Sequence, residues 1–89
     1  MKLFFTKTFV RDYRKLPQDI QELIDKQLRL LLSNSRHPSL RIKKMNDPRE
    51  IWEGRVTDAY RFTFTLDKET YILRKVGTHD TLKNPLNIF

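Results

Sequence analysis

Near the end of the chain, an arginine and a histidine are spaced so that a β-hairpin would bring them together. Arg61 lies at the start of the segment YRFTFTL (residues 60–66), and His79 follows the segment YILRKVGT (residues 71–78). Two strands joined by a short turn run antiparallel, so the start of the first lies beside the end of the second. A fixed cation beside a titratable imidazole suits cleavage of a phosphodiester. The alternative is a surface arginine and a solvated loop histidine.

The alternation of side chains leaves one difficulty in this pairing. Successive residues of a strand point to opposite faces, and simple alternation through the hairpin places His79 on the face opposite to Arg61. A break in the strand at Gly77 would be needed to reorient the histidine.

Composition limits the other chemistry that is open to the chain. Its 89 residues are enough for a single domain (residues 1–89) with one modest core. The absence of cysteine excludes disulfides and thiolate sites, and two histidines, His37 and His79, make a transition-metal site unexpected. We therefore expect no metal and no cofactor. No segment resembles a signal peptide or a membrane span, so we expect a cytoplasmic protein without membrane contact.

The charge of the chain favours a polyanionic partner. The formal net charge is +7, which suits nucleic acid or an acidic protein segment. The alternative is a basic protein with no such partner.

The apolar pattern predicts a strand, two helices and then four strands. KLFFT (residues 2–6) predicts the first strand, and Thr8 is the expected cap of a short helix. Residues 18–33 predict a longer helix with an apolar stripe formed by Ile20, Leu23, Ile24, Leu28 and Leu31. Further strands are expected at residues 40–45, 51–57 and 60–66 and from Tyr71 onward. The core is expected to include Phe4, Phe5, Phe62 and Phe64, with Trp52 in the core or at a helix–sheet seam.

This layout predicts an α+β fold with one face of the sheet left uncovered. The last three strands are joined by hairpins and must be antiparallel, and two helices can cover only one face of their sheet. The other face, which carries Arg61, is expected to be open to solvent or to a ligand.

The order of elements and several short motifs resemble the RelE/ParE toxin superfamily, and within it the RelE-like toxins of bacterial toxin–antitoxin operons. The resemblance extends over nearly the whole chain, from the KLFFT segment and the helical hairpin onward. WEGRVTDAYR (residues 52–61) is similar to a stretch of the YoeB-type ribonucleases, and GTHD (residues 77–80) is similar to a motif of the YafQ type. The family fold would be a small twisted antiparallel β-sheet with an N-terminal strand and a helical hairpin packed on one face.

The resemblance implies a function as well as a fold. It implies an mRNA interferase, a metal-independent endoribonuclease that cleaves ribosome-bound messenger RNA by attack of a 2′-hydroxyl on the adjacent phosphorus. The implied partners are mRNA, the ribosome and a cognate acidic antitoxin, with operator DNA contacted only indirectly through the antitoxin. The alternatives are a ParE-like inhibitor of DNA gyrase and a catalytically inert relative that only binds an antitoxin.

Roles for individual residues follow from the same resemblance. Arg61 would hold phosphate oxygens and offset transition-state charge, and His79 would be the general acid to the leaving oxygen. Lys43 or Lys44 would supply a general base or a phosphate-binding cation, and only one of these adjacent strand residues can face the site.

Three further cations are expected to bind substrate. Arg55 matches a basic position of the YoeB type, and Arg74 and Lys75 extend the positive surface. The chain also departs from the family, because Trp52 and Gly54 stand near positions where some RelE-type enzymes carry lysines. Its tail has no tyrosine and instead contains Asn84, Pro85 and Leu86.

Overall fold

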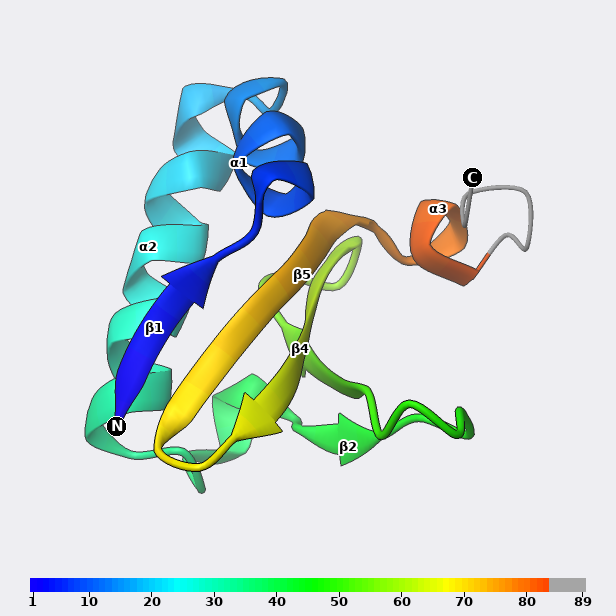
Figure 1. The fold of residues 1–89 in the computed structure, drawn as a ribbon. Helices are drawn as coiled ribbons and strands as arrows, with labels where there is room; N and C mark the ends of the chain where they lie inside the picture. Colours follow the sequence, from blue (N-terminus) through cyan, green and yellow to red (C-terminus); the bar gives the residue numbers. More distant parts are fainter. Residues whose placement is uncertain (84–89) are drawn as a thin grey trace.

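In the computed structural model, which describes residues 1–83, five strands form one mixed sheet in the order β1-β5-β4-β3-β2 (Figure 1). The strands are β1 (Lys2–Phe5), β2 (Lys43–Lys44), β3 (Trp52–Arg55), β4 (Tyr60–Asp67) and β5 (Thr70–Thr78). The helices are α1 (Lys7–Arg14), α2 (Gln18–Ser33) and α3 (His79–Lys83), with a 3₁₀ turn, η1 (Pro38–Leu40). The expected α+β class is therefore confirmed, while the tail residues Asn84, Pro85 and Leu86 lie outside the described part of the chain.

Two details of the elements differ from the sequence-based expectation. The pairing of β1 with β5 is parallel, while the other three pairs are antiparallel. The first helix is capped by Thr6 rather than Thr8, because Thr6 Oγ1 accepts a hydrogen bond from the backbone N–H of Phe9 at 3.2 Å. The same hydroxyl donates to the carbonyl of Leu73 at 2.9 Å, which ties the start of α1 to β5.

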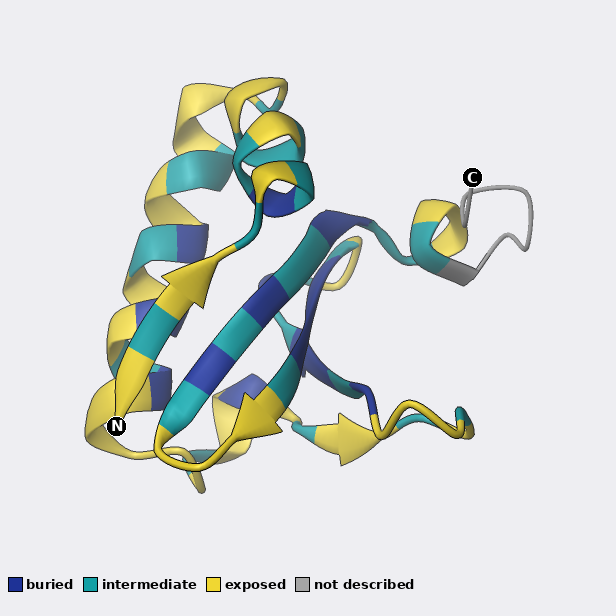
Figure 2. Cartoon of the chain, in the orientation of Figure 1, coloured by how far each residue is buried: buried dark blue, intermediate teal, exposed yellow. Residues whose placement is uncertain are grey.

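The core lies between α1, α2 and one face of the sheet. Figure 2 shows that burial is concentrated on β4 and β5, while the edge strands β1 and β2 are largely exposed. Phe62 and Phe64 are in the core as expected, and the expected stripe of α2 is buried at Ile24, Leu28 and Leu31. Trp52 packs against this core from β3.

The expectation that Phe4 and Phe5 are core residues was wrong. Their side chains are 58% and 44% exposed, because β1 is an edge strand that the helices cover only in part. Phe5 contacts α1, with its ring centroid 5.5 Å from that of Phe9. Within residues 1–83, no helix has both the length and the apolar character needed to cross a membrane.

One irregularity in the β4–β5 hairpin decides which residues face away from the helices. Arg61 opposes Gly77 and Thr63 opposes Lys75, but the next pair is Phe64 with Leu73, so β5 carries one extra residue, Arg74. A β-bulge of this kind shifts the alternation of side chains by one residue. As a result, Gly77 lies on the same face as Arg61, and so does position 79, two residues further along the chain. The break in alternation is thus at Arg74 and not at Gly77.

Candidate functional site

A polar groove lies on the face of the sheet opposite to α1 and α2, where β2, β3 and β4 approach the end of β5. Its volume is about 570 Å³, and its lining residues are Arg41, Ile42, Lys43, Glu53, Arg55, Arg61 and His79. We call this the basic groove, because its four lysine and arginine side chains outnumber its single carboxylate. The structure therefore places four of the candidate residues, Arg61, His79, Lys43 and Arg55, around one cavity.

Arg61 forms one wall of the basic groove and is held there firmly. Its Nη1 donates hydrogen bonds to the backbone carbonyls of Thr57, of Asp58 at 3.0 Å and of Tyr60 at 3.0 Å. The residue is only 7% exposed. The expectation that this face of the sheet is open to solvent is therefore wrong at the Arg61 side chain. The physical reason is that the β3–β4 turn folds over the side chain and uses it to satisfy backbone carbonyls. The result is a cation with a fixed position.

Glu53 is a buried carboxylate between two cations of the groove. It is 4% exposed, and its Oε1 lies 3.7 Å from Arg61 Nε and 3.8 Å from Lys43 Nζ. A carboxylate is tolerated at such a depth only where cations compensate its lost hydration. Sequence reasoning missed this residue. The signal was present in its position two residues before Arg55 on the same strand, which places both side chains on one face.

The two lysines of β2 point to opposite faces, as expected. Lys43 opposes Glu53 and lines the groove. Lys44 opposes Trp52, and its Nζ lies 6.0 Å from the Trp52 ring centroid and 3.4 Å from Glu50 Oε1. Of the two, Lys43 is therefore the one placed to contact a ligand of the groove.

His79 is the first residue of α3, directly after β5. Its backbone N–H donates to the carbonyl of Ala59 at 2.9 Å, which holds the end of β5 against the β3–β4 turn. The ring is half-buried, and its Nδ1 is buried without a hydrogen-bond partner among the described residues. The backbone bond to Ala59 thus fixes where the residue leaves the sheet.

Two arginines complete the basic groove. Arg55 opposes Arg61 across the β3–β4 pair, and its Nη1 lies 3.2 Å from Asp58 Oδ1. Arg41 follows η1 in the left-handed backbone region, with φ of 43°. Sequence reasoning missed Arg41, and no pattern in the sequence marks it, because a side chain with positive φ interrupts the alternation expected of a strand.

The other two predicted substrate-binding residues lie outside the groove. Arg74 is the bulge residue, and burial together with nearby Arg49 lowers its pKa. Lys75 lines a separate pocket with Asp12 and Arg11 of α1. The structure does not place either side chain beside Arg61 and His79.

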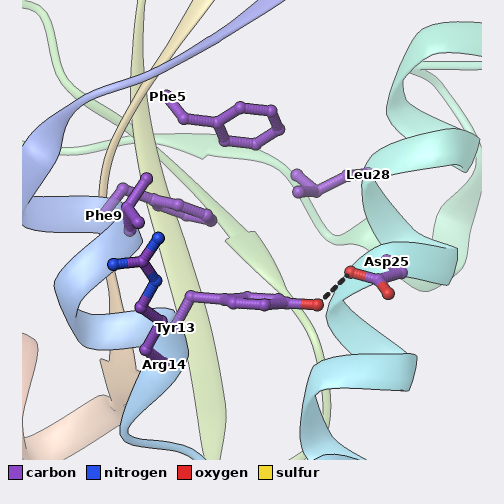
Figure 3. A pocket seen from close by; sticks show the side chains of 7 residues that line it. Phe5, Phe9, Tyr13, Arg14, Asp25 and Leu28 are labelled. Carbon is purple, nitrogen blue, oxygen red and sulfur yellow. Dashed lines mark hydrogen bonds between the residues drawn. The ribbon is translucent and has the colours of Figure 1, made fainter.

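An apolar pocket of about 360 Å³ lies apart from the basic groove, between β1, α1 and α2 (Figure 3). Phe5, Phe9 and Leu28 line it. At its edge, Tyr13 of α1 donates a hydrogen bond from its hydroxyl to Asp25 Oδ1 of α2 at 2.8 Å. This bond is the main reason that the pKa of Tyr13 is raised.

Comparison with known proteins confirms the fold. Neither a protein-family model nor a curated protein matches the sequence. Among solved structures, YafQ from E. coli strain BL21(DE3) matches with a TM-score of 0.76 and 12% identity over 91% of this chain and 96% of that one. A YoeB/ParE toxin from Agrobacterium tumefaciens matches with a TM-score of 0.70 and 18% identity, over 89% and 99% of the two chains.

A third similar structure contains a bound partner. The RelB–RelE antitoxin–toxin complex from Methanococcus jannaschii matches with a TM-score of 0.71 and 29% identity, over 89% of this chain and 93% of that one. The similar structures are thus RelE-, YoeB- and YafQ-type toxins, which supports the resemblance to the RelE/ParE toxin superfamily.

Proposed function

We propose that this chain is the toxin of a type II toxin–antitoxin system and an endoribonuclease that cleaves messenger RNA on the ribosome without a metal. The observation that carries this proposal is the basic groove, in which Arg61, Lys43 and His79 line one cavity. The fold shared with RelE-, YoeB- and YafQ-type toxins is consistent with it.

The chemistry assigned to the groove is an internal displacement at phosphorus. The 2′-hydroxyl of one nucleotide loses its proton to solvent water and attacks the adjacent phosphorus, and the 5′-oxygen of the next nucleotide leaves. Arg61 and Lys43 offset the charge that grows on the phosphoryl oxygens. His79 donates a proton to the leaving oxygen, a step that typically contributes about 10²- to 10⁴-fold to the rate. The products are a 2′,3′-cyclic phosphate and a 5′-hydroxyl.

The proposed protein partner is an acidic antitoxin that is disordered when free. The net charge of +7 favours an acidic chain. The edge strand β1 with its exposed Phe4 and Phe5, and the apolar pocket beside it (Figure 3), offer a strand edge and a groove to such a segment. Operator DNA would be reached through the antitoxin, and the protein would act in the cytoplasm.

The test is induction of the wild type and of histidine variants in a bacterium, followed by mapping of mRNA 5′ ends. His79→Asn removes the proposed acid. His37→Asn is the matched control in the loop before η1, where His37 Nδ1 accepts a hydrogen bond from the backbone N–H of Ser39 and lies outside the lining of the basic groove. We expect growth arrest with new cuts inside translated codons for the wild type and for His37→Asn, and loss of both effects for His79→Asn. Arrest with broken DNA and intact mRNA would instead support a gyrase inhibitor, and the absence of arrest would support an inert relative.

A further inference from the structure

We propose that Arg41 binds a phosphate of the RNA next to the scissile one, an assignment that rests on the nuclease function proposed above. Arg41 lines the basic groove and is exposed there. Its role is to hold the substrate strand in the groove, while bond cleavage belongs to the other end of the groove.

The position of Arg41 follows from the register of the sheet. In the antiparallel β2–β3 pair, a register extended two residues back from Lys43 places position 41 beside Arg55. Arg55 opposes Arg61 in the next pair, β3–β4. The three arginines therefore form a row that begins at the β2 edge of the sheet and leads towards His79, which follows β5. Neighbouring strands are about 4.8 Å apart, so β2 and β5 are separated by about 14 Å, more than one phosphate group spans.

The backbone of Arg41 is held in this place from the helix side of the sheet. Gln27 of α2 is 6% exposed, and its Nε2 donates to the carbonyls of Arg55 at 2.9 Å and of Ser39 at 3.4 Å. One buried side chain therefore joins the end of β3 to η1. The backbone N–H of Arg41 in turn donates to the carbonyl of Pro38 at 3.2 Å, so the residue is fixed to the end of η1.

The charge of Arg41 is not compensated within the part of the chain that the structure describes. The other three lysine and arginine side chains of the groove each have a carboxylate within 4 Å. Within residues 1–83, the guanidinium of Arg41 has neither an ion pair nor a hydrogen bond. A guanidinium offers five N–H donors whose geometry matches phosphate oxygens, so Arg41 is available to bind an RNA phosphate without breaking a contact of the folded chain.

The backbone conformation of Arg41 is also unusual for an arginine. Its φ of 43° lies in the left-handed region, which glycine adopts at less cost than residues with a Cβ. Neither burial nor an ion pair within residues 1–83 offsets this cost. A contact between the side chain and a ligand of the groove would offset it.

Replacement of single RNA phosphates by neutral methylphosphonates tests the contact directly. The substrate is a short mRNA on programmed ribosomes, cut at a codon where 5′-end mapping places the wild-type cleavage. Three RNAs are compared, one fully charged and two with a methylphosphonate at the linkage on the 5′ side or the 3′ side of the scissile one. The nucleotide before each of these two flanking linkages is a 2′-deoxynucleotide in all three RNAs, which keeps the neutral linkages stable.

The proteins compared are the wild type, Arg41→Gln, Arg41→Lys and a charge-matched control. The control is Arg36→Gln, because Arg36 is exposed in the loop between α2 and η1 and lies outside the lining of the groove. Single-turnover cleavage is measured over a range of protein concentrations. This separates the half-saturating concentration, which reports binding, from the rate at saturation, which reports the chemical step.

The expected pattern is specific to one phosphate. On the fully charged RNA, Arg41→Gln should raise the half-saturating concentration about tenfold and leave the rate at saturation within about threefold of the wild type. On one of the two methylphosphonate RNAs, the wild type should show the same loss, and Arg41→Gln should add less than about twofold to it, because the contact is already absent. Arg41→Lys should retain part of the wild-type binding, and Arg36→Gln should match the wild type on every RNA.

A purely structural role for Arg41 gives a different result. The loss caused by Arg41→Gln would then be the same on all three RNAs, and this outcome overturns the inference. An unchanged half-saturating concentration for Arg41→Gln overturns it too, as does an equal loss for Arg36→Gln. Failure of the wild type to cleave the fully charged RNA overturns the nuclease function itself.

Discussion

Replacement of Gly54 by alanine gives a quantitative test of how β3 packs against β4. Gly54 opposes Phe62, and a Cβ at this position would lie 2.2 Å from Cζ, 2.6 Å from Cε1 and 2.8 Å from Cε2 of the phenylalanine ring. Carbon atoms in contact are about 3.5–4.0 Å apart, so the ring would have to retreat by more than about 1 Å. Phe62 is 0% exposed and belongs to the core, so a shift of its ring must displace neighbouring core side chains.

The expected cost of Gly54→Ala is about 3 kcal/mol, at the upper end of the range for overpacked cores. A domain of this length has a total stability of roughly 4–13 kcal/mol, so the variant would lose a large fraction of it. The melting temperature should fall by about 12–24 °C. Urea denaturation followed by circular dichroism measures the free energy directly.

A double variant identifies the cause of the loss. Leucine lacks the outer ring atoms that collide, so Gly54→Ala combined with Phe62→Leu should be at least about 1 kcal/mol more stable than the sum of the single losses predicts. Gly77→Ala is the matched control, because its new Cβ would meet only Thr81 Cγ2, at 3.9 Å, within 4 Å. Strict additivity, or a Gly54→Ala loss no larger than that of Gly77→Ala, would refute this account of the packing.

Two further predictions concern ion pairs. Arg61→Ala should lower the free energy of unfolding by about 3–5 kcal/mol in urea denaturation, because it leaves Glu53 with one fewer cation and removes the hydrogen bonds to the β3–β4 turn. The stability of Arg61→Lys should lie between that of Arg61→Ala and that of the wild type. A loss below about 1 kcal/mol for Arg61→Ala would mean that the buried contacts of the guanidinium do not stabilise the fold. Hydrogen bonds from Arg49 lower the pKa of Asp47 from 3.8 to about 2, so the carboxylate stabilises the folded state above pH 4 and this contribution is lost as the pH falls towards 2. The stability difference between wild type and Asp47→Asn should therefore be full at pH 5 and disappear near pH 2, and a difference that stays constant over this range would contradict the pairing.

The fold was largely predictable because its main elements have strong periodic patterns. The helix over residues 18–33 agrees with α2, and the strand over residues 60–66 agrees with β4 to within one residue. The strand expected at residues 40–45 is reduced to Lys43–Lys44, since Pro38–Leu40 form a 3₁₀ turn and Arg41 adopts positive φ. The pattern of apolar residues alone cannot show which strand lies at an edge, and this is why the exposure of Phe4 and Phe5 was missed.

The candidate site was predictable only in part. The approach of Arg61 and His79 followed from hairpin geometry, but the parity of His79 depends on the bulge. The sequence did contain a sign of the bulge. The buried residues Tyr71, Leu73 and Val76 are spaced two and then three positions apart, which breaks regular alternation. Glu53 was overlooked although it lies two residues before Arg55 on the same strand, because the pattern does not show that cations from β2 and β4 lie beside it.

The extra residue of β5 also constrains how chains of this fold can change in length. Substitution of Arg74 leaves the number of residues between Arg61 and His79 unaltered, whereas its deletion would return β5 to regular alternation and rotate the segment that follows towards the helices. Gain or loss of residues should therefore be confined to places such as the exposed turn between β4 and β5. Among related sequences, a fixed distance from the bulge to the histidine would identify those that keep the basic groove intact.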